Sequence, residues 1–445
     1  MHEIWRELSA NQQDLLIFLS LVLPVVVVAF AVSFRFAPYA VVRSIFIKNF
    51  TVNIVFVAVI ATSIAISVAL IIQERAVREV TANAVNKFDL IVAPSGSEIT
   101  QMLKVVFLQP LKTNLLDGNT LNEIKDHPNV TMAAPLAFGD NWNGYPIIGT
   151  TNEFLNHLYG TKDKIYFNGL WDGIAGVGVG LEAGRSIMPS HGLAGVQQRD
   201  NDLMAEHADD INITQVAPVT GTPWDGAILV TIESVWVVHG LPDGHVGNDI
   251  DKPNDMQLGH PFDPVSFPGT SAVIVKTKKL YDLYNVREDF NSDGLMAFFP
   301  GNILSRLHAV LGDVRALFSV LSTITQFLVS LSIILGISVF AKLLRHRFAL
   351  LQALGAPRRF VLAVMWWYGA TIIISGTILG TLVGFISTGI VSGYVSELVG
   401  LRVQGVILWE ELHLIGGFLG ITSLAILVPA IIESQRPIVA GLREN

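Results

Sequence analysis

Five long apolar stretches dominate the pattern of hydrophobic and polar positions along this 445-residue chain. Each is close to or longer than the roughly 20 residues that a helix needs to cross the hydrocarbon core of a bilayer. None has Asp, Glu, Lys or Arg in its interior, which argues against a proton-coupled pump, a charge-lined channel or a voltage sensor. The pattern predicts a multi-pass α-helical membrane protein with about five spans: Leu15–Phe34, Asn53–Ile72, Phe318–Ala341, Phe360–Ile386 and His413–Ile432.

The first stretch has a signal peptide as its alternative interpretation, because Ala29-Phe30-Ala31 resembles a cleavage site. A signal peptide begins with a basic segment. The residues before this stretch include Glu3, Glu7 and Asp14. We therefore expect an uncleaved transmembrane helix.

Composition supports the membrane assignment and excludes several function classes. The chain is 51% hydrophobic and only 15% charged, whereas soluble domains carry about 25% charged residues. Its net charge of −8 does not suit a nucleic-acid-binding protein. It has no cysteine, which excludes disulfides, thiolate metal sites and cysteine catalysis.

The short loops predict the orientation, since cytoplasmic loops are enriched in Lys and Arg. The segment 35–52 carries Arg35, Arg43 and Lys48 without an acid, and the loop 342–359 carries five basic residues without an acid. The loop 394–412 carries three Glu against one Arg. Five spans then place the N-terminus outside, the C-terminus inside and the acidic segment 74–310 outside the cytoplasm.

The segment between the second and third spans predicts a large α+β extracytoplasmic domain. Short β-like runs alternate in it with helical patches and turn signals. The chain thus divides into an extra N-terminal transmembrane helix (1–34), a cytoplasmic or interfacial segment (35–52), a transmembrane helix (53–73), the large domain (74–310) and a three-helix region (311–445) with a cytoplasmic loop (342–360). The predicted strands include Leu90–Ala93, Ala227–Ile232, Ser234–Val238 and Ala272–Val275, and the predicted helices Asn122–Lys125 and Thr151–Leu158.

Helical periodicity continues beyond the membrane at both edges of this domain. Apolar residues recur every four positions from Ile72 to Phe88, and at helical spacing from Ile303 to Val314. Two helices running unbroken from the bilayer into the domain would form a stiff stalk. The alternative is that they simply pack the domain onto the membrane.

No catalytic motif is evident, so we do not expect an enzyme. The chain has no Gly-x4-Gly-Lys-Ser/Thr loop, no Gly-x-Ser-x-Gly and no His-Glu-x-x-His. A loop rich in His and Asp is the candidate metal site, with His239, Asp243, His245 and His260 as potential Zn²⁺ ligands beside Asp249, Asp251 and Asp255. The alternative is a solvated acidic loop without metal.

The most specific motif is Arg345-His-Arg-Phe-Ala-Leu-Leu-Gln-Ala-Leu-Gly-Ala-Pro-Arg-Arg-Phe-Val361 in the basic loop. The chain closes on Pro429-Ala-Ile-Ile-Glu-Ser-Gln-Arg-Pro437-Ile-Val-Ala-Gly-Leu-Arg443, and the segments 88–96 and 220–240 carry further family-like runs. Together, and in this order, these motifs resemble the MacB/FtsX-type permeases, the type VII class of ABC transporters. The segments 88–96 and 220–240 resemble the periplasmic core domain of MacB.

The resemblance implies a permease of the bacterial inner membrane that forms a dimer and binds two copies of a separate ATPase, where ATP and Mg²⁺ bind. It implies a coupling helix, about Arg345–Leu354, ended by Gly355. Two departures stand out: Phe348 occupies a position where many relatives have Glu, and the first helix lies outside the usual four-span plan. The residues expected to contact the ATPase are Arg345, Arg347, Leu350, Leu351, Leu354, Gly355, Arg358 and Arg359.

Small residues repeat on the last two spans and predict close helix packing. Gly376, Gly380 and Gly384 follow each other at four-residue spacing, as do Gly416 and Gly420. We expect them to pack helices within one chain, with the dimer interface as the alternative.

Three functions fit these observations. The first is a mechanotransmission permease, in which the stalk carries ATP-driven motion to the external domain without substrate crossing the bilayer. The second is a transporter that extracts lipoproteins or lipids. The third is a regulatory protein that activates an external cell-wall hydrolase. Cargo, and any periplasmic adaptor or lipoprotein partner, are not determined by the sequence.

Overall fold

A computed structural model describes residues 2–160, 165–191, 210–247, 256–292, 294–399 and 405–437. The chain forms two compact units. We call residues 1–76, 312–392 and 404–445 the membrane domain, and residues 77–311 with 393–403 the inserted domain.

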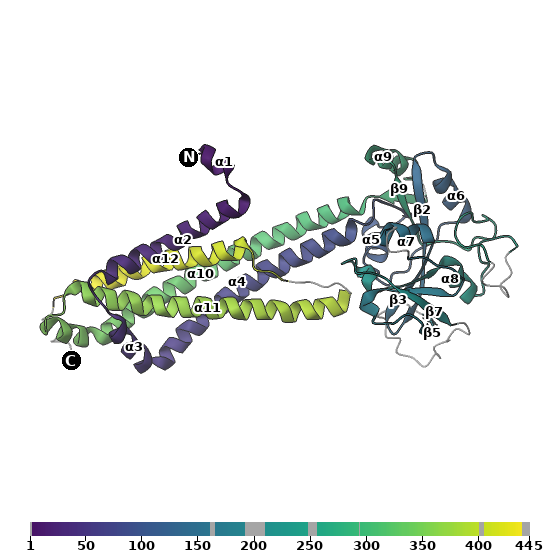
Figure 1. Cartoon of the computed structure of the whole chain (residues 1–445). Helices are drawn as coiled ribbons and strands as arrows, with labels where there is room; N and C mark the ends of the chain where they lie inside the picture. Colours follow the sequence, from purple (N-terminus) through teal and green to yellow (C-terminus); the bar gives the residue numbers. More distant parts are fainter. Residues whose placement is uncertain are drawn as a thin grey trace. The chain divides into compact units, whose positions relative to one another are not determined.

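The membrane domain is a helical bundle (Figure 1). Five of the described helices are long and apolar enough to cross a membrane, and the inserted domain lies in sequence between the second and third of them, which confirms the predicted fold class. The first span is helical from Ala10 because Ser9 and Gln12 form a capping box at its start. The helices are α1 (His2–Glu7), α2 (Ala10–Ser33), α3 (Tyr39–Lys48), α4 (Phe50–Val85), α10 (Pro300–Ala353), α11 (Arg358–Val399) and α12 (Trp409–Ser434).

Glycines set the closest contacts within the bundle. A Cβ added to Gly380 of α11 would lie 2.6 Å from the carbonyl oxygen of Ala61 on α4, and one added to Gly376 would lie 2.7 Å from Cβ of Ile60. Gly384 faces Ala65 in the same way. These glycines therefore let the backbones of α4 and α11 touch within one chain.

The extra first span packs by the same principle. A Cβ on Gly420 of α12 would collide with the Leu21 carbonyl of α2, and one on Gly416 would lie 3.2 Å from the Phe18 ring. At the N-terminal ends of the two helices, His413 Nε2 donates to the Asp14 carbonyl at 2.9 Å. The first span is therefore an integral part of the bundle, seated on α12 (Figure 1).

The inserted domain is built on one mixed sheet, whose strand order is β10-β1-β9-β2-β3-β8-β4-β7-β5, with β6 beside β2. Within the described strands, β3–β8 and β4–β7 are parallel pairs. The strands are β1 (Leu90–Pro94), β2 (Val130–Trp142), β3 (Tyr145–Thr150), β4 (Asp172–Ala175), β5 (Ser186–Ile187), β6 (Ser190–His191), β7 (Ile211–Val216), β8 (Ile228–Thr231), β9 (Ala272–Thr277) and β10 (Leu295–Phe298). The helices are α5 (Glu98–Val105), α6 (Gly118–Asp126), α7 (Asn152–Tyr159), α8 (Ile232–Val238) and α9 (Leu280–Asp289), with 3₁₀ turns η1 (Val177–Val179) and η2 (Pro223–Gly226).

Each face of the sheet carries its own hydrophobic core, because successive side chains of a strand point to opposite faces. Along β1, Ile91 and Ala93 belong to one core, and Leu90 and Val92 to the other. The first core also contains residues of α5 and α7, together with the end of α4 and the start of α10. Helices α6, α8 and α9 contribute to the second core.

One predicted strand is wrong. Residues Ser234–Val238 belong to α8, a short helix that starts at Ile232. Thr231 caps it, since its hydroxyl accepts a hydrogen bond from the Ser234 N–H at 3.2 Å. The continuous apolar run of this segment suits a buried helix as well as a strand, so periodicity alone did not separate them.

The coupling segment also differs from the expectation of a separate helix in a loop. Residues 345–353 are the last turns of α10, which is continuous from Pro300 to Ala353. The predicted helical extensions are confirmed, since α4 continues to Val85 and α10 begins at Pro300.

A bulky substitution at a packed glycine should separate two helices. Gly380→Val places a side chain against the Ala61 backbone, so we expect it to cost about 1–3 kcal/mol. Thermal melting of the purified protein in lipid nanodiscs measures this. Gly389→Val is the matched control, because a Cβ at Gly389 on the same helix meets nothing within 4 Å. Equal melting of the two variants would contradict the packing role.

Candidate functional site

The end of α10 is a well-formed helix terminus. The Ala356 N–H donates to the Leu351 carbonyl at 2.9 Å, and the Gly355 N–H donates to the Gln352 carbonyl at 3.0 Å. This pair of bonds is a Schellman motif, which needs a left-handed residue, and Gly355 supplies it with a φ of +102°. Arg358 then starts α11 one residue after Pro357. The turn between α10 and α11 is therefore held in one conformation by its own backbone.

One face of this terminus is apolar, basic and uncovered. Leu343, Leu350 and Leu354 are 75%, 44% and 86% exposed. Arg347 lies between them on the same helical face, and Arg358 and Arg359 are exposed at the start of α11. Exposed leucines rimmed by charge are typical of a protein-binding surface. We call Leu343, Arg347, Leu350, Leu354, Arg358 and Arg359 the terminal patch.

The opposite face of the same turns is buried in the bundle. Phe348 is 6% exposed and lines a small apolar cavity with Ile45, Ile337 and Tyr368. The side chain that replaces the family's Glu is thus a packing residue. A carboxylate there would be desolvated among apolar side chains, which is costly.

Arg345 does not belong to the terminal patch. Its Nε donates to Glu433 Oε1 of α12 at 2.7 Å, and both side chains are largely buried. Glu433 Oε2 also contacts Arg436 at 3.1 Å. The family-like closing segment of the chain is therefore tied to the end of α10. Sequence reasoning missed this pair because the two residues lie 88 positions apart.

A second buried ion pair joins α4 to α12. Arg75 Nη2 lies 2.8 Å from Glu411 Oε1, and the Glu411 side chain is fully buried. Arg75 also donates to the Val406 carbonyl, and Glu411 accepts a hydrogen bond from the Leu408 N–H at 2.8 Å. Glu410 lies 3.7 Å from the same guanidinium. Glu410 and Glu411, which we predicted to lie in an external loop, therefore both contact Arg75, just beyond the second predicted span.

Residues 319–435 match the family model of the FtsX-like permease C-terminal domain. The match runs from α10 through the terminal patch to the Glu433 ion pair. The C-terminal part of this chain is an FtsX-like permease domain, as the motif at 345–361 led us to expect. The match supports a membrane-embedded permease subunit of an ABC transporter. No curated protein matches the chain significantly. The MacB-like assignment of residues 74–310 stays a prediction.

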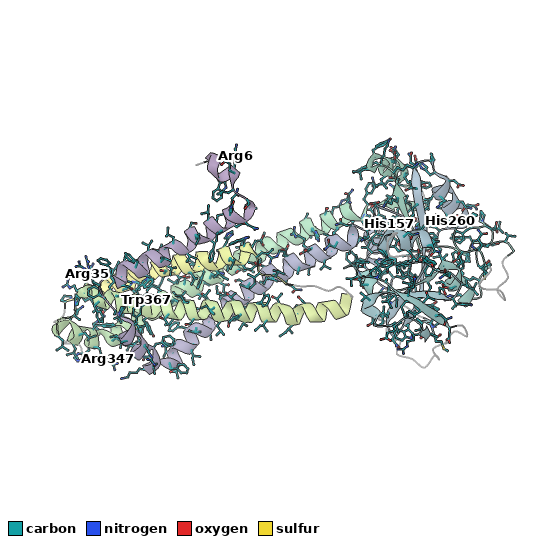
Figure 2. The ribbon with its side chains drawn as sticks, in the orientation of Figure 1. Arg6, Arg35, His157, His260, Arg347 and Trp367 are labelled. Carbon is teal, nitrogen blue, oxygen red and sulfur yellow. The ribbon has the colours of Figure 1, made fainter. Side chains whose placement is uncertain are left out.

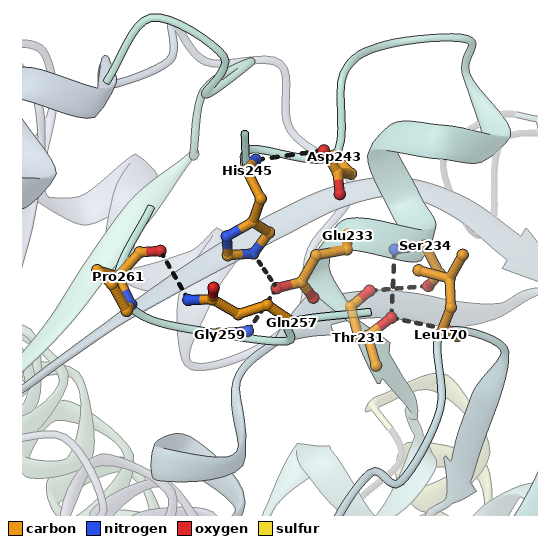
Figure 3. A network of polar contacts seen from close by, with 9 residues as sticks. All are labelled: Leu170, Thr231, Glu233, Ser234, Asp243, His245, Gln257, Gly259 and Pro261. Atoms are coloured by element: carbon orange, nitrogen blue, oxygen red, sulfur yellow. Dashed lines mark hydrogen bonds and ion pairs between the residues drawn. The ribbon is translucent and has the colours of Figure 1, made fainter. Parts of the chain in front are cut away.

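The permease's histidine candidates have separate partners. Figure 3 shows the His245 ring and the Gly259 N–H meeting at the Glu233 carboxylate of α8, at 3.4 and 2.6 Å. Asp243 accepts a hydrogen bond from the His245 N–H instead of facing its ring. This buried carboxylate ties His245 and Gly259 to α8.

His239 and His260 lie in other contacts. His239 Nε2 is 3.4 Å from Asp140, whose carboxylate raises the pKa of His239. His260 Nε2 donates to the Ala133 carbonyl at 2.8 Å, and burial lowers the pKa of His260. Among the described residues, no three His, Asp or Glu side chains are grouped to hold a metal ion. Asp249, Asp251 and Asp255 lie outside those residues, so the Zn²⁺ site stays a prediction.

Removing one partner of the α10–α12 ion pair should destabilise the permease. Arg345→Met leaves Glu433 buried next to Arg436 alone, and we expect a loss of about 3 kcal/mol. Arg347→Met, an exposed position two residues away, should change stability by less than about 0.5 kcal/mol. Chemical unfolding in detergent compares the two variants. The assigned role of Arg345 fails if both unfold like the unmodified chain.

Proposed function

We propose that this permease transmits the ATP-driven closure of a separate ATPase dimer to its inserted domain. The observation that supports this most is the continuity of α10. Its last turns carry the terminal patch, and its first turn contributes Ile303 and Leu304 to the core of the inserted domain. The single helix α10 thus takes part both in the predicted contact with the ATPase and in the core of the inserted domain, which the ATPase is proposed to move.

The length of α10 suits this role. Its 54 residues would span about 80 Å, which far exceeds the roughly 30 Å of a hydrocarbon core. Helix α4 likewise runs for 36 residues and ends at Ala84 and Val85 in the same core. Displacing either helix at the membrane end would therefore strain close-packed contacts in the inserted domain, because packed interiors transmit strain.

The composition of the spans suits relative motion of the helices better than a charged pathway for ions or protons. Within the apolar stretches, which contain no acid or base, polar contacts between spans include hydroxyl pairs, such as Ser67 with Ser322 and Ser330 with Thr422. Uncharged hydroxyl pairs re-form after a shift between helices more easily than buried ion pairs do. Efflux through a partner and handling of cargo from the outer leaflet are both compatible with this mechanism.

The proposed orientation places the terminal patch in the cytoplasm of a bacterial cell. Arg35 and Arg347 lie at the same end of the membrane domain (Figure 2). Both loops that are rich in Lys and Arg therefore share one side, as the positive-inside rule requires for cytoplasmic loops. The inserted domain is then periplasmic, and the family plan adds a second copy of this chain and two ATPase subunits.

Two variants separate docking from transmission. Leu354→Glu puts a charge in the terminal patch and should reduce co-purification of the ATPase at least tenfold. Leu317→Pro breaks α10 at an exposed position and should leave ATPase binding intact, but abolish ATP-dependent movement of the inserted domain. Movement is measured by electron–electron double resonance between spin labels at residue 281 of the two copies, since Tyr281 is exposed.

Leu317→Ala and Lys48→Glu are the matched controls, one at the same helical position and one on an exposed residue of α3. Both should bind the ATPase and move normally. Transmission through α10 is contradicted if Leu317→Pro retains the full ATP-dependent change in distance.

Topology is testable directly because the chain has no cysteine. A single cysteine at residue 2 or 281 should react with a membrane-impermeant maleimide in intact spheroplasts, and one at residue 347 only after permeabilisation. The five-span orientation predicts this asymmetry. Labelling of residue 2 only after permeabilisation would contradict it.

A further inference from the structure

The inserted domain contains a buried lysine without a counterion. Lys104, in the last turn of α5, is 4% exposed. Its ammonium donates to the Thr113 hydroxyl at 2.6 Å and the Ser271 hydroxyl at 3.1 Å, and it lies 5.3 Å from the centre of the Phe138 ring. Among the described residues, no carboxylate lies within ion-pair distance of it. Buried charges are normally paired, so this arrangement calls for an anion.

The lysine lines a cavity. A water-sized sphere can move within only about 20 Å³ of it, and the space reaches about 300 Å³ when the part open to solvent is included. Its wall is mainly apolar, with Leu108, Pro110, Phe138, Pro146 and Ile147, and Gln109 adds an amide. A ligand in this cavity would meet one ammonium group, the carboxylate of Asp140 and a mainly apolar wall.

Two charged side chains line the cavity, Lys104 and Asp140. The Asp140 carboxylate lies 3.4 Å from His239 Nε2, whereas the Lys104 ammonium, within the described part of the chain, contacts only hydroxyl groups and the Phe138 ring. Burial lowers the pKa of Lys104 to about 8. The amine is therefore mostly protonated at pH 7, yet loses its charge at a pH where ordinary lysines keep theirs.

The rim of the cavity is strained. Leu108 has a φ of +55°, in the left-handed region that a branched side chain rarely adopts. Such strain persists only where surrounding contacts impose it, and it concentrates at ligand sites. Leu108, Gln109 and Pro110 form the start of the segment that leads from α5 to Thr113, so the strained residue and one partner of the lysine lie on the same segment.

We propose that this cavity binds a small organic carboxylate, with its charge on the Lys104 ammonium and its apolar body against Phe138 and Ile147. A single ammonium with one nearby amide matches a monoanion, whereas a phosphate group needs more donors. The apolar wall excludes a fully hydrated inorganic ion as the preferred ligand.

Binding at this place has a path to the stalk helices. Met102 and Val105 of α5 flank Lys104 in sequence and belong to the core that contains Val85 of α4 and Ile303 of α10. Occupancy of the cavity thus acts one helical turn from the contacts of both helices that enter the inserted domain.

The test uses the full chain in nanodiscs, with acetate, butyrate and hexanoate as probes at constant ionic strength. We expect butyrate to raise the melting temperature and to give a calorimetric binding isotherm at pH 7. Each additional buried CH₂ should tighten binding about fourfold. Above a pH of about 8, affinity should fall about tenfold per pH unit, because the neutral amine does not attract a carboxylate.

Lys104→Met should abolish the butyrate effect, and Lys112→Met should retain it, because Lys112 is an exposed lysine of the same segment. The proposed site is overturned by an equal butyrate effect in Lys104→Met, by binding that persists unchanged to pH 10, or by an equal effect of chloride. If Lys104→Met fails to fold, the pH profile of the unmodified chain decides alone.

Discussion

Close contact between helix backbones is the constraint on which this molecule depends. Lipid surrounds the spans with tails as apolar as their own side chains, so hydrophobic burial does not hold the helices together there. Packing does, and it needs positions without a side chain. Gly376, Gly380 and Gly384 bring α11 onto α4, while Gly416 and Gly420 bring α12 onto α2. At these contacts no side chain of α11 or α12 separates the two helix backbones.

Buried ion pairs then fix α12 at both of its ends. Glu411 near its start is bound by Arg75 of α4, and Glu433 near its end by Arg345 of α10. A buried pair contributes little net stability, but leaving one partner uncompensated costs several kcal/mol. The two ion pairs therefore specify that α12 lies beside α4 and α10, and they fix its position along the bundle axis. The long helices α4 and α10, which enter the inserted domain, are each tied to the same short one.

The sequence was a reliable guide wherever one local rule decides the structure. A span needs about 20 apolar residues, and all five appear. The Asn143-Gly144 pair is such a local signal, since both residues adopt positive φ and form the two-residue turn of the β2–β3 hairpin. The strand prediction for Ser234–Val238 was wrong because a mostly buried run has no polar alternation to show its period. Arg345 and Lys104 could not be understood from their neighbours, because their environments come from residues 88 and 167 positions away.

The packing of the first span against α12 also determines which face of α12 is closed to other proteins. Its glycine face is already filled by Phe18 and Leu21 of the same chain. Another membrane protein, or a second copy, would meet other surfaces of the bundle, where α2, α4, α10, α11 and the opposite side of α12 all carry exposed leucines, isoleucines or valines. The additional helix thus acts as a built-in partner: it occupies one docking face in advance and narrows the set of assemblies that the bundle can enter.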